Sequence, residues 1–247
     1  MSNFAIYAQA QNLSSLKTGA SASPVTYSEI SKSQSYALTG GSTDEVKLSY
    51  SAPQNFNCVA ITGLNDFPTI TVTKTLSASD TALGTISGPD YAATSRARGT
   101  FNALLIFADQ SADDITLTFS TPYPTGFRTV FAGYLVFQPL DNFEQGVGFV
   151  DATDFDTVAT RSSSYQTTRS RLRAFNPSMM RLSDDEFHNV NYAKYLIGDD
   201  NCLAVLDSSN TSPEMWIVAS IAGGSSQLID DGHNQQNIQF KEANKWL

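Results

Sequence analysis

The first 140 residues repeat short segments in which apolar and polar positions alternate with a period of two. Such alternation is typical of β-strands that bury one face, and the β-branched and aromatic residues that fill these segments favour strands. Gly-Gly and Pro-containing turns separate several of them. The expected strands cover residues 46–50, 59–61, 70–75, 101–107, 115–119 and 131–137. This pattern, without a long helical period, predicts a β-sandwich or jelly roll over residues 36–145.

Residues 54–75, with the sequence QNFNCVAITGLNDFPTITVTKT, show this pattern most clearly. Two strands with β-branched residues flank a connection from Gly63 to Pro68 that is rich in turn formers. The segment therefore favours an antiparallel β structure for the first half of the chain.

The chain changes character on both sides of this region. Residues 1–35 are rich in Ser, Ala and Gln, and Phe4, Ile6 and Tyr7 are apolar residues that start either a strand or an arm. We expect an N-terminal arm over residues 1–35. After Pro139 the sequence becomes rich in Asp and Gly, which indicates a boundary near residues 140–150.

Residues 146–247 predict a second, mostly antiparallel β module that carries one helix. Ser183 and Glu186 have the spacing of a capping box. Phe187, Val190, Ala193 and Ile197 follow at helical spacing, and Gly198 suits a helix end. We therefore expect a helix at 184–197, with strands at 202–206, 214–221, 227–229 and 237–240.

The charge balance argues against a nucleic-acid-binding protein. The net charge is −9, whereas phosphate binding depends on Lys and Arg. The N-terminus lacks a secretory pattern, and the chain lacks the long apolar run of a membrane span, so we expect the cytoplasm or a particle assembled there. Cys58 and Cys202 are expected to be buried thiols, although a disulfide is possible on sequence alone.

Candidate catalytic residues are sparse. The two histidines, His188 and His233, have no metalloprotease or phosphatase spacing, and the chain has no nucleophile elbow or phosphate-binding loop. The paired carboxylates at 113–114, 199–200 and 230–231 fall where turns are expected. Asp151, Asp154 and Asp156 are the best candidates for calcium, but they lack an EF-hand pattern. We therefore expect that the protein is not an enzyme and that it binds neither a cofactor nor a metal.

Arginine is concentrated in one region, since five of the eight arginines lie between residues 161 and 181. Arg169, Arg171 and Arg173 would project from one face of a single strand at 167–175, with Arg161 nearby. Arginine is favoured at interfaces and pairs with carboxylates. Two interpretations of this arginine face are equally open: it contacts an acidic surface of a neighbouring subunit, or it is simply solvated. Contact with DNA is a weaker alternative.

Aromatic residues in expected loops offer a different interaction. Tyr123, Phe127 and Phe143 could stack on sugar rings, or they could pack in the core or at an interface. They are the candidate glycan contacts of this chain.

The chain resembles tail-tip proteins of tailed phages. VKLSYSAPQNFNCVAITGLN, TITVTKT and FRTVFAGYLVFQP are similar to a galactose-binding-like (discoidin-type) jelly roll. TTRSRLRAF, SDDEFHNVNYAKYLIG, CLAVLD, EMWIVASI and NIQFKEA are similar to the tail-tube-like β-barrel of distal tail proteins. No discoidin-type sugar site is evident at matching positions.

This resemblance implies a structural virion protein that forms rings, commonly hexameric, and joins the tail tube to the tip. The implied partners are copies of itself and other tail proteins such as tube, hub and fibres. A host-recognition adhesin that binds a surface glycan is the alternative.

Overall fold

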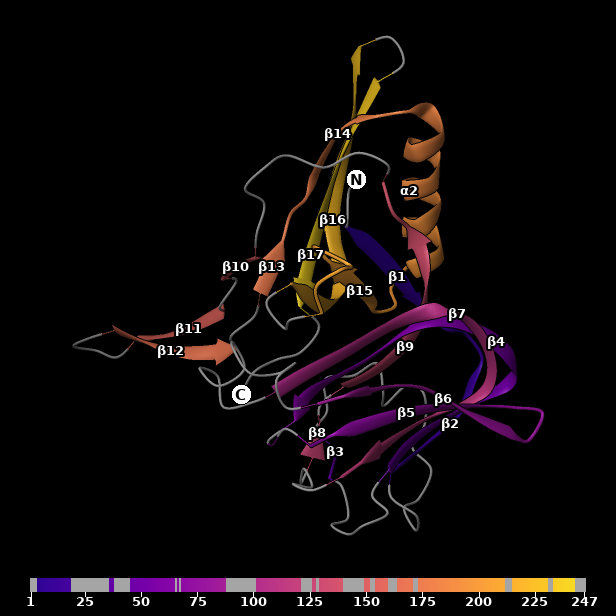
Figure 1. Ribbon diagram of the computed structural model, residues 1–247. Helices are drawn as coiled ribbons and strands as arrows, with labels where there is room; N and C mark the ends of the chain where they lie inside the picture. The colour runs from indigo at the N-terminus through magenta and orange to yellow at the C-terminus, as the bar shows by residue number, and fades with distance from the viewer. Residues whose placement is uncertain are drawn as a thin grey trace.

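The structure is a computed structural model that describes most of the chain (Figure 1). The described residues are 4–18, 36–37, 45–64, 66, 68–87, 101–120, 126–127, 129–139, 149–151, 154–159, 164–170, 173–211, 215–230 and 233–242. Strands dominate them, and one helix, α2 (Asp184–Ile197), lies among them. The mainly-β prediction is confirmed.

Most of these strands join one antiparallel sheet. Its order is β10-β13-β17-β16-β15-β1-β9-β4-β7-β5-β6, with β14 beside β17 and β2 beside β4. Its strands are β1 (Ala5–Gln9), β2 (Leu13–Thr18), β4 (Glu45–Leu64), β5 (Ile70–Leu76), β6 (Ser79–Ile86), β7 (Phe101–Phe119), β9 (Thr129–Phe137), β10 (Phe149–Asp151), β13 (Arg173–Phe175), β14 (Ser178–Leu182), β15 (Cys202–Val205), β16 (Trp216–Asp230) and β17 (His233–Glu242). Two small pairs stand apart, β3 (Tyr36–Ala37) with β8 (Gly126–Phe127), and β11 (Asp154–Ala159) with β12 (Ser164–Ser170).

Two long bent strands fold the first part of the sheet onto itself. The first half of β4 lies between β2 and β7, and its second half lies between β9 and β7. The β4–β7 register shifts between Ser49 and Gln54, where both strands turn together (Figure 1). The expected strands 46–50 and 59–61 are thus two ends of one strand, and 101–107 and 115–119 are two ends of β7.

The bend encloses the first hydrophobic cluster. Val46 and Leu48 from one end of β4 and Val59 and Ile61 from the other end belong to the same buried cluster. Within each pair the residues are two positions apart and share one face of the strand. The register shifts between Ser49 and Gln54 and between Phe56 and Cys58 allow the odd-numbered pair to face the same cluster as the even-numbered pair.

The connection expected from Gly63 to Pro68 begins too early, because β4 continues to Leu64 and β5 begins at Ile70. These two strands are not neighbours: β7 pairs with β4, and β5 pairs with the far side of β7.

The N-terminal strand β1 joins the two parts of the sheet. It pairs with β9 on one side and with β15 on the other. All its residues are buried. Gly133 of β9 permits this close pairing, because a Cβ there would collide with the carbonyl oxygen of Ala8. The expectation of an arm is therefore wrong for residues 4–18, which belong to the sheet; the rest of 1–35 lies outside the described residues.

A middle hydrophobic cluster is built by both parts of the chain. Leu104 and Phe131 from the first part meet Trp216 and Val218 from the second, with Tyr7 of β1 among them. Trp216 is fully buried, and its indole N–H donates to the carbonyl oxygen of Thr211 at 3.0 Å. The sheet and this core therefore continue across the boundary expected near residues 140–150.

The third cluster lies between the sheet and α2. The helix buries Val190, Ala193 and Ile197. Phe4, Phe175 and Phe240 pack together beneath it, with ring centroids 5.7, 5.9 and 6.5 Å apart. Phe4 directly precedes β1, Phe175 ends β13 and Phe240 lies in β17, so the cluster holds three separate segments together.

The predicted helix and both of its ends are confirmed. The Ser183 hydroxyl accepts the Glu186 amide at 3.3 Å, and the Glu186 carboxylate accepts the Ser183 amide at 3.0 Å. Gly198 has a positive φ of 54°, and its N–H donates to the Lys194 carbonyl at 3.0 Å. This capping satisfies backbone groups that the helix itself leaves unpaired.

Replacement of Phe4 tests whether the two parts fold as one unit. We expect Phe4→Ala to lower the free energy of unfolding by about 3–5 kcal/mol, because it removes a fully buried ring. Hydrogen exchange should then accelerate together in β4 and β16. Thr81→Ala, at an exposed position, is the control and should change stability by less than about 0.5 kcal/mol. Faster exchange in only one of the two strands would contradict a shared core.

The buried thiols predict a loss of stability at alkaline pH. Burial raises the pKa of Cys202 to about 12 and the pKa of Cys58 well above its usual value. Above the unfolded thiol pKa of about 8.5, the unfolded chain loses protons that the folded chain keeps. The free energy of unfolding should therefore fall as pH rises above that value, by up to about 1.4 kcal/mol per pH unit for each thiol.

Denaturant titrations at a series of alkaline pH values measure this slope. Cys202→Ala should make it shallower, because only one buried thiol then remains of the two cysteines. An unchanged slope in this variant would show that Cys202 does not contribute.

Candidate interaction surfaces

The arginine-rich region divides between two separate sheets. Arg169 lies in β12, which pairs with β11, whereas Arg173 begins β13 in the main sheet. The expected single strand over 167–175 is therefore wrong, and Arg169 and Arg173 do not follow one strand. Arg161 and Arg171 lie outside the described residues.

Arg173 has a structural partner within its own chain. Its Nη2 lies 3.0 Å from Oε1 of Glu242, its Nε lies 3.3 Å from the same oxygen, and its backbone N–H donates to Oε2 at 2.9 Å. Only 12% of the Arg173 side chain and 2% of the Glu242 side chain are exposed. The pair ties β13 to β17, so the prediction of Arg173 as a subunit contact is corrected to an internal ion pair.

The candidate glycan contacts are also changed by the structure. Phe127 lies in β8 and is 1% exposed within the first hydrophobic cluster, so it cannot stack on a sugar from solvent. Tyr123 and Phe143 lie outside the described residues. A glycan site built on these three aromatics is therefore not assembled by the described part of the chain.

A long hairpin extends from one edge of the sheet. Its base is β10 paired with β13, where Asp151 stands opposite Arg173. Its outer part is β11 paired with β12, where Asp154 stands opposite Ser170. Figure 1 shows β11 and β12 reaching away from the main sheet. From here on, β11 and β12 together are called the arm; this name does not refer to the N-terminal arm that was expected over residues 1–35.

The strand β16 has an edge without a described neighbour over more than half of its length. β15 pairs with β16 only from Trp216 to Ala219, and beyond that point β17 is the one described strand beside it. Residues 222–227 are exposed. Residues 220–228, with the sequence SIAGGSSQL, contain neither a charge nor a proline. We call residues 220–228 of β16 the free edge.

The free edge was missed in the sequence because two separate strands were expected, at 214–221 and 227–229, where the structure has the single strand β16. Gly223 and Gly224, which weaken a strand, lie between the two expected strands. The useful signal was Asp231-Gly232, one of the dipeptides typical of a two-residue hairpin. In the structure Asp230 stands opposite His233, so β16 and β17 are antiparallel neighbours up to these two residues. A Cβ on Gly224 would collide with the carbonyl oxygen of Asn237, which explains the glycine.

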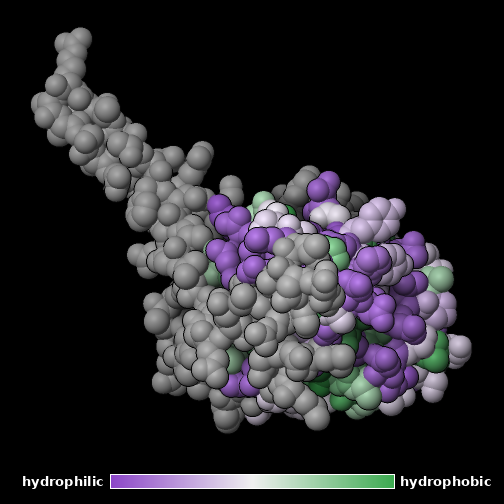
Figure 2. Space-filling view, turned by 90° about the horizontal axis from the view of Figure 1, so that it is seen from above, coloured by the Kyte–Doolittle hydropathy of each residue, from purple (hydrophilic) through white to green (hydrophobic). Residues whose placement is uncertain are grey.

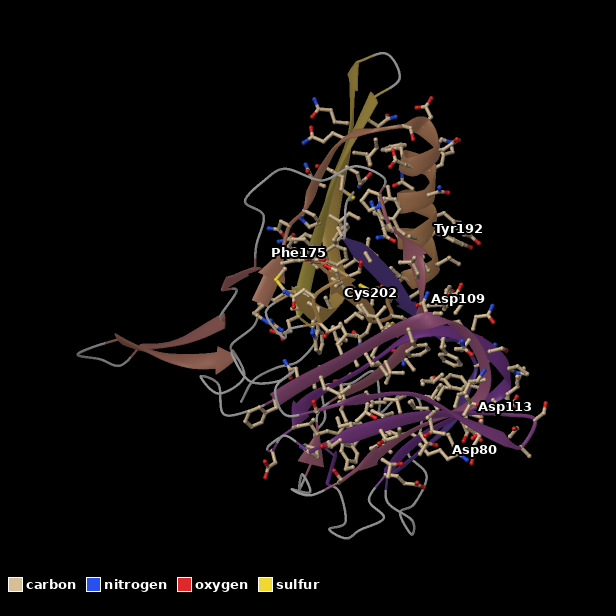
Figure 3. All side chains as sticks on the ribbon, in the orientation of Figure 1. Asp80, Asp109, Asp113, Phe175, Tyr192 and Cys202 are labelled. Atoms are coloured by element: carbon tan, nitrogen blue, oxygen red, sulfur yellow. The ribbon has the colours of Figure 1, made fainter. Side chains whose placement is uncertain are left out.

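The outer face of α2 carries an aromatic stripe. Tyr192 is 60% exposed and Tyr195 is 80% exposed, and the exposed His188 lies one turn before Tyr192. Figure 3 shows Tyr192 on the outer side of the helix, whereas Cys202 and Phe175 lie among the strands. The pKa of Tyr134 on β9 is raised mainly by its burial and, to a smaller extent, by the nearby Tyr192. Tyrosines are enriched at protein interfaces.

A polar groove lies on the outer face of the folded sheet. It has a volume of about 330 Å³, and the described residues that line it include no aromatic. Of the lining residues, Thr75 donates to Asp80 at 2.6 Å, and Lys47 pairs with Asp114, which lies outside the lining, at 3.0 Å. Asp113 and Asp114, expected in a turn, lie in β7, where Asp113 accepts the Ser77 amide at 2.7 Å.

The described residues contain no cluster of three or more His, Cys, Asp or Glu side chains able to hold a metal. The calcium candidates Asp151, Asp154 and Asp156 lie in β10 and β11, and their side chains are not among those described. Within the same part of the chain, no helix combines the length and hydrophobicity needed to cross a membrane.

Comparison with protein-family models, with curated proteins and with solved structures finds no match to this chain. Its functional assignment therefore depends on the surfaces described above and on the sequence resemblance.

The Arg173–Glu242 pair is tested by removing one partner at a time. We expect Arg173→Ala to lower the free energy of unfolding by about 3–5 kcal/mol, because it leaves a buried carboxylate without its guanidinium. Arg173→Met combined with Glu242→Leu should be less damaging than the single change. Denaturant titration measures the free energy of unfolding of each variant. If Arg173→Ala is as stable as the unchanged protein, this structural role is contradicted.

Proposed function

We propose that this chain is a structural subunit of a phage tail, at the distal tail or tail tip, that assembles with copies of itself into a ring joining the tail tube to the tip. The resemblance to tail-tip proteins supplies the biological setting. The observation that carries self-assembly is the free edge of β16.

A strand edge exposes backbone N–H and C=O groups that can pair with another strand. Natural proteins usually protect such edges with lysine, proline, a bulge or a covering element. The free edge has a register shift between Ile221 and Gly223, but it has neither lysine nor proline, and residues 222–227 are exposed. This composition suits an edge that is covered by another polypeptide in the assembled state.

A ring requires two different surfaces on each subunit. Contacts between unlike surfaces continue from one copy to the next and close if the rotation permits. The free edge, the arm and the aromatic stripe of α2 belong to different elements, so one chain offers several unlike surfaces. This supports a head-to-tail association rather than a purely two-fold one.

The adhesin alternative gains no specific support from the described residues. Phe127 is buried, and none of the described residues that line the polar groove is an aromatic on which a sugar ring could stack. We therefore rank the structural function above it.

The assembly of the full chain is the direct test. Mass photometry and negative-stain electron microscopy of the purified protein should reveal a closed ring whose subunit number gives its symmetry. A protein that stays monomeric at every attainable concentration, and that is absent from virions containing its labelled form, would contradict the proposed function.

A further inference from the structure

We infer that the arm of one copy adds to the free edge of β16 in the next copy, so that backbone hydrogen bonds between strands join neighbouring subunits. This inference rests on the proposed function and names the contact that would build the ring. The arm and the free edge are the two partners.

The free edge has the properties of a strand acceptor. β17 occupies one side of β16 through pairs such as Gly223 with Gln239 and Ser225 with Asn237. Ser226 donates to Gln236 at 2.7 Å, and Asn237 donates to Ser225 at 3.2 Å, so side chains reinforce that same side. An antiparallel strand alternates its backbone groups between its two sides. The groups on the other side of residues 220–228 are therefore directed away from β17.

The arm has the properties of a strand donor. β11 and β12 form a two-stranded sheet of their own, and each is the other's described partner. An isolated two-stranded hairpin is marginally stable in water. Addition to a third strand would stabilise it. β12 has seven residues, which fits within the eleven-residue stretch from 220 to 230 left uncovered by β15.

The chemistry of the two surfaces favours a second copy as the occupant. The arm strands carry Asp154, Asp156 and Arg169, charges of both signs, and the free edge carries none, so pairing brings no like charges together. Seen from above, the described surface is largely hydrophilic with small, scattered hydrophobic areas (Figure 2). Recognition through the backbone does not need a large apolar patch.

The position of the arm also suits a contact between copies. Figure 1 places the arm beside β10 and β13, whereas the far end of β16 lies at the top of the molecule. Each copy can therefore give its arm to one neighbour and accept an arm from another. Such unlike contacts produce a ring or an open chain rather than a dimer.

Shortening the arm is the first test. Because Asp151 stands opposite Arg173, residues 152–172 can be replaced by Asn-Gly, which suits a two-residue hairpin. We expect this variant to keep the melting temperature of the parent and to lose ring assembly. A shortened protein that assembles like the parent would overturn the inference and leave the proposed function intact.

Proline substitutions test the free edge without relying on the arm. Ser226 and Gln227 are adjacent, so one directs its N–H to β17 and the other to the free side. Proline removes that donor. Ser226→Pro and Gln227→Pro should therefore differ: one lowers the melting temperature, and the other keeps it but raises the concentration needed for assembly at least about tenfold. Normal assembly by the variant that keeps its melting temperature would overturn the inference.

Cross-linking tests the contact itself. Thr167→Cys in one preparation and Gln227→Cys in another are mixed and treated with a bismaleimide; the native Cys58 and Cys202 are buried and should not react. We expect a covalent dimer only in the mixture, and a ladder of larger species when both cysteines share one chain. Thr81→Cys, at an exposed position of β6, replaces Gln227→Cys as the control. Dimers formed equally well with this control would overturn the inference.

These results separate the two proposals. Assembly of the unchanged protein without arm-to-edge cross-links retains the ring and rejects this contact. Absence of assembly in the unchanged protein rejects both.

Discussion

The pairing of β1 with both β9 and β15 is the constraint on which the rest of the structure depends. One face of this strand contributes Ala5 and Tyr7 to the middle cluster, and the other contributes Ile6 and Ala8 to the cluster beneath α2. The same five-residue strand therefore completes the hydrogen bonding of two parts of the sheet and two of its cores. Because interiors are tightly packed, neither cluster can be rearranged without affecting the other. The positions of α2, of the β16–β17 hairpin and of the arm at β10 and β13 all follow from this central strand.

The second determinant is the common bend of β4 and β7. Each strand changes neighbours along its length. The paired strands β4 and β7 therefore contribute to both layers of the sheet that enclose the first cluster. The second half of β4 is buried on both faces, with Val59 and Ile61 in the first cluster and Cys58 and Ala60 in the middle cluster. The folded sheet and the helix-covered sheet are thus continuous, which gives a rigid base to the surfaces proposed for assembly.

The sequence predicted the mainly-β class and the helix because both signals are local. The Ser183–Glu186 capping box and the spacing of Val190, Ala193 and Ile197 need no distant contact. The β5–β6 hairpin was missed because Ser77 and Ala78 both have positive φ, 50° and 61°, where Asn-Gly or Asp-Gly is the usual sequence. The Asp113 carboxylate accepts the Ser77 amide at this turn. Likewise, the partner of Arg173 is Glu242, 69 positions away, and nothing near Arg173 indicates it. Of the candidate contacts, Phe127 and Arg173 were misjudged because their burial depends on such long-range packing.

The distance along the chain between β1 and its partners also has a consequence for biosynthesis. Ile6 pairs with Phe137, and Ala5 pairs with Val205, so β1 is synthesised long before either of its neighbouring strands. Contacts of such long sequence separation form slowly. During translation, Phe4 and Ile6 would stay without their final neighbours, and the exposed strand would be open to incorrect pairing or to a chaperone. The two parts of the sheet can then be joined through β1 only after β15 has been synthesised, and the surfaces proposed for assembly take their final positions after that step.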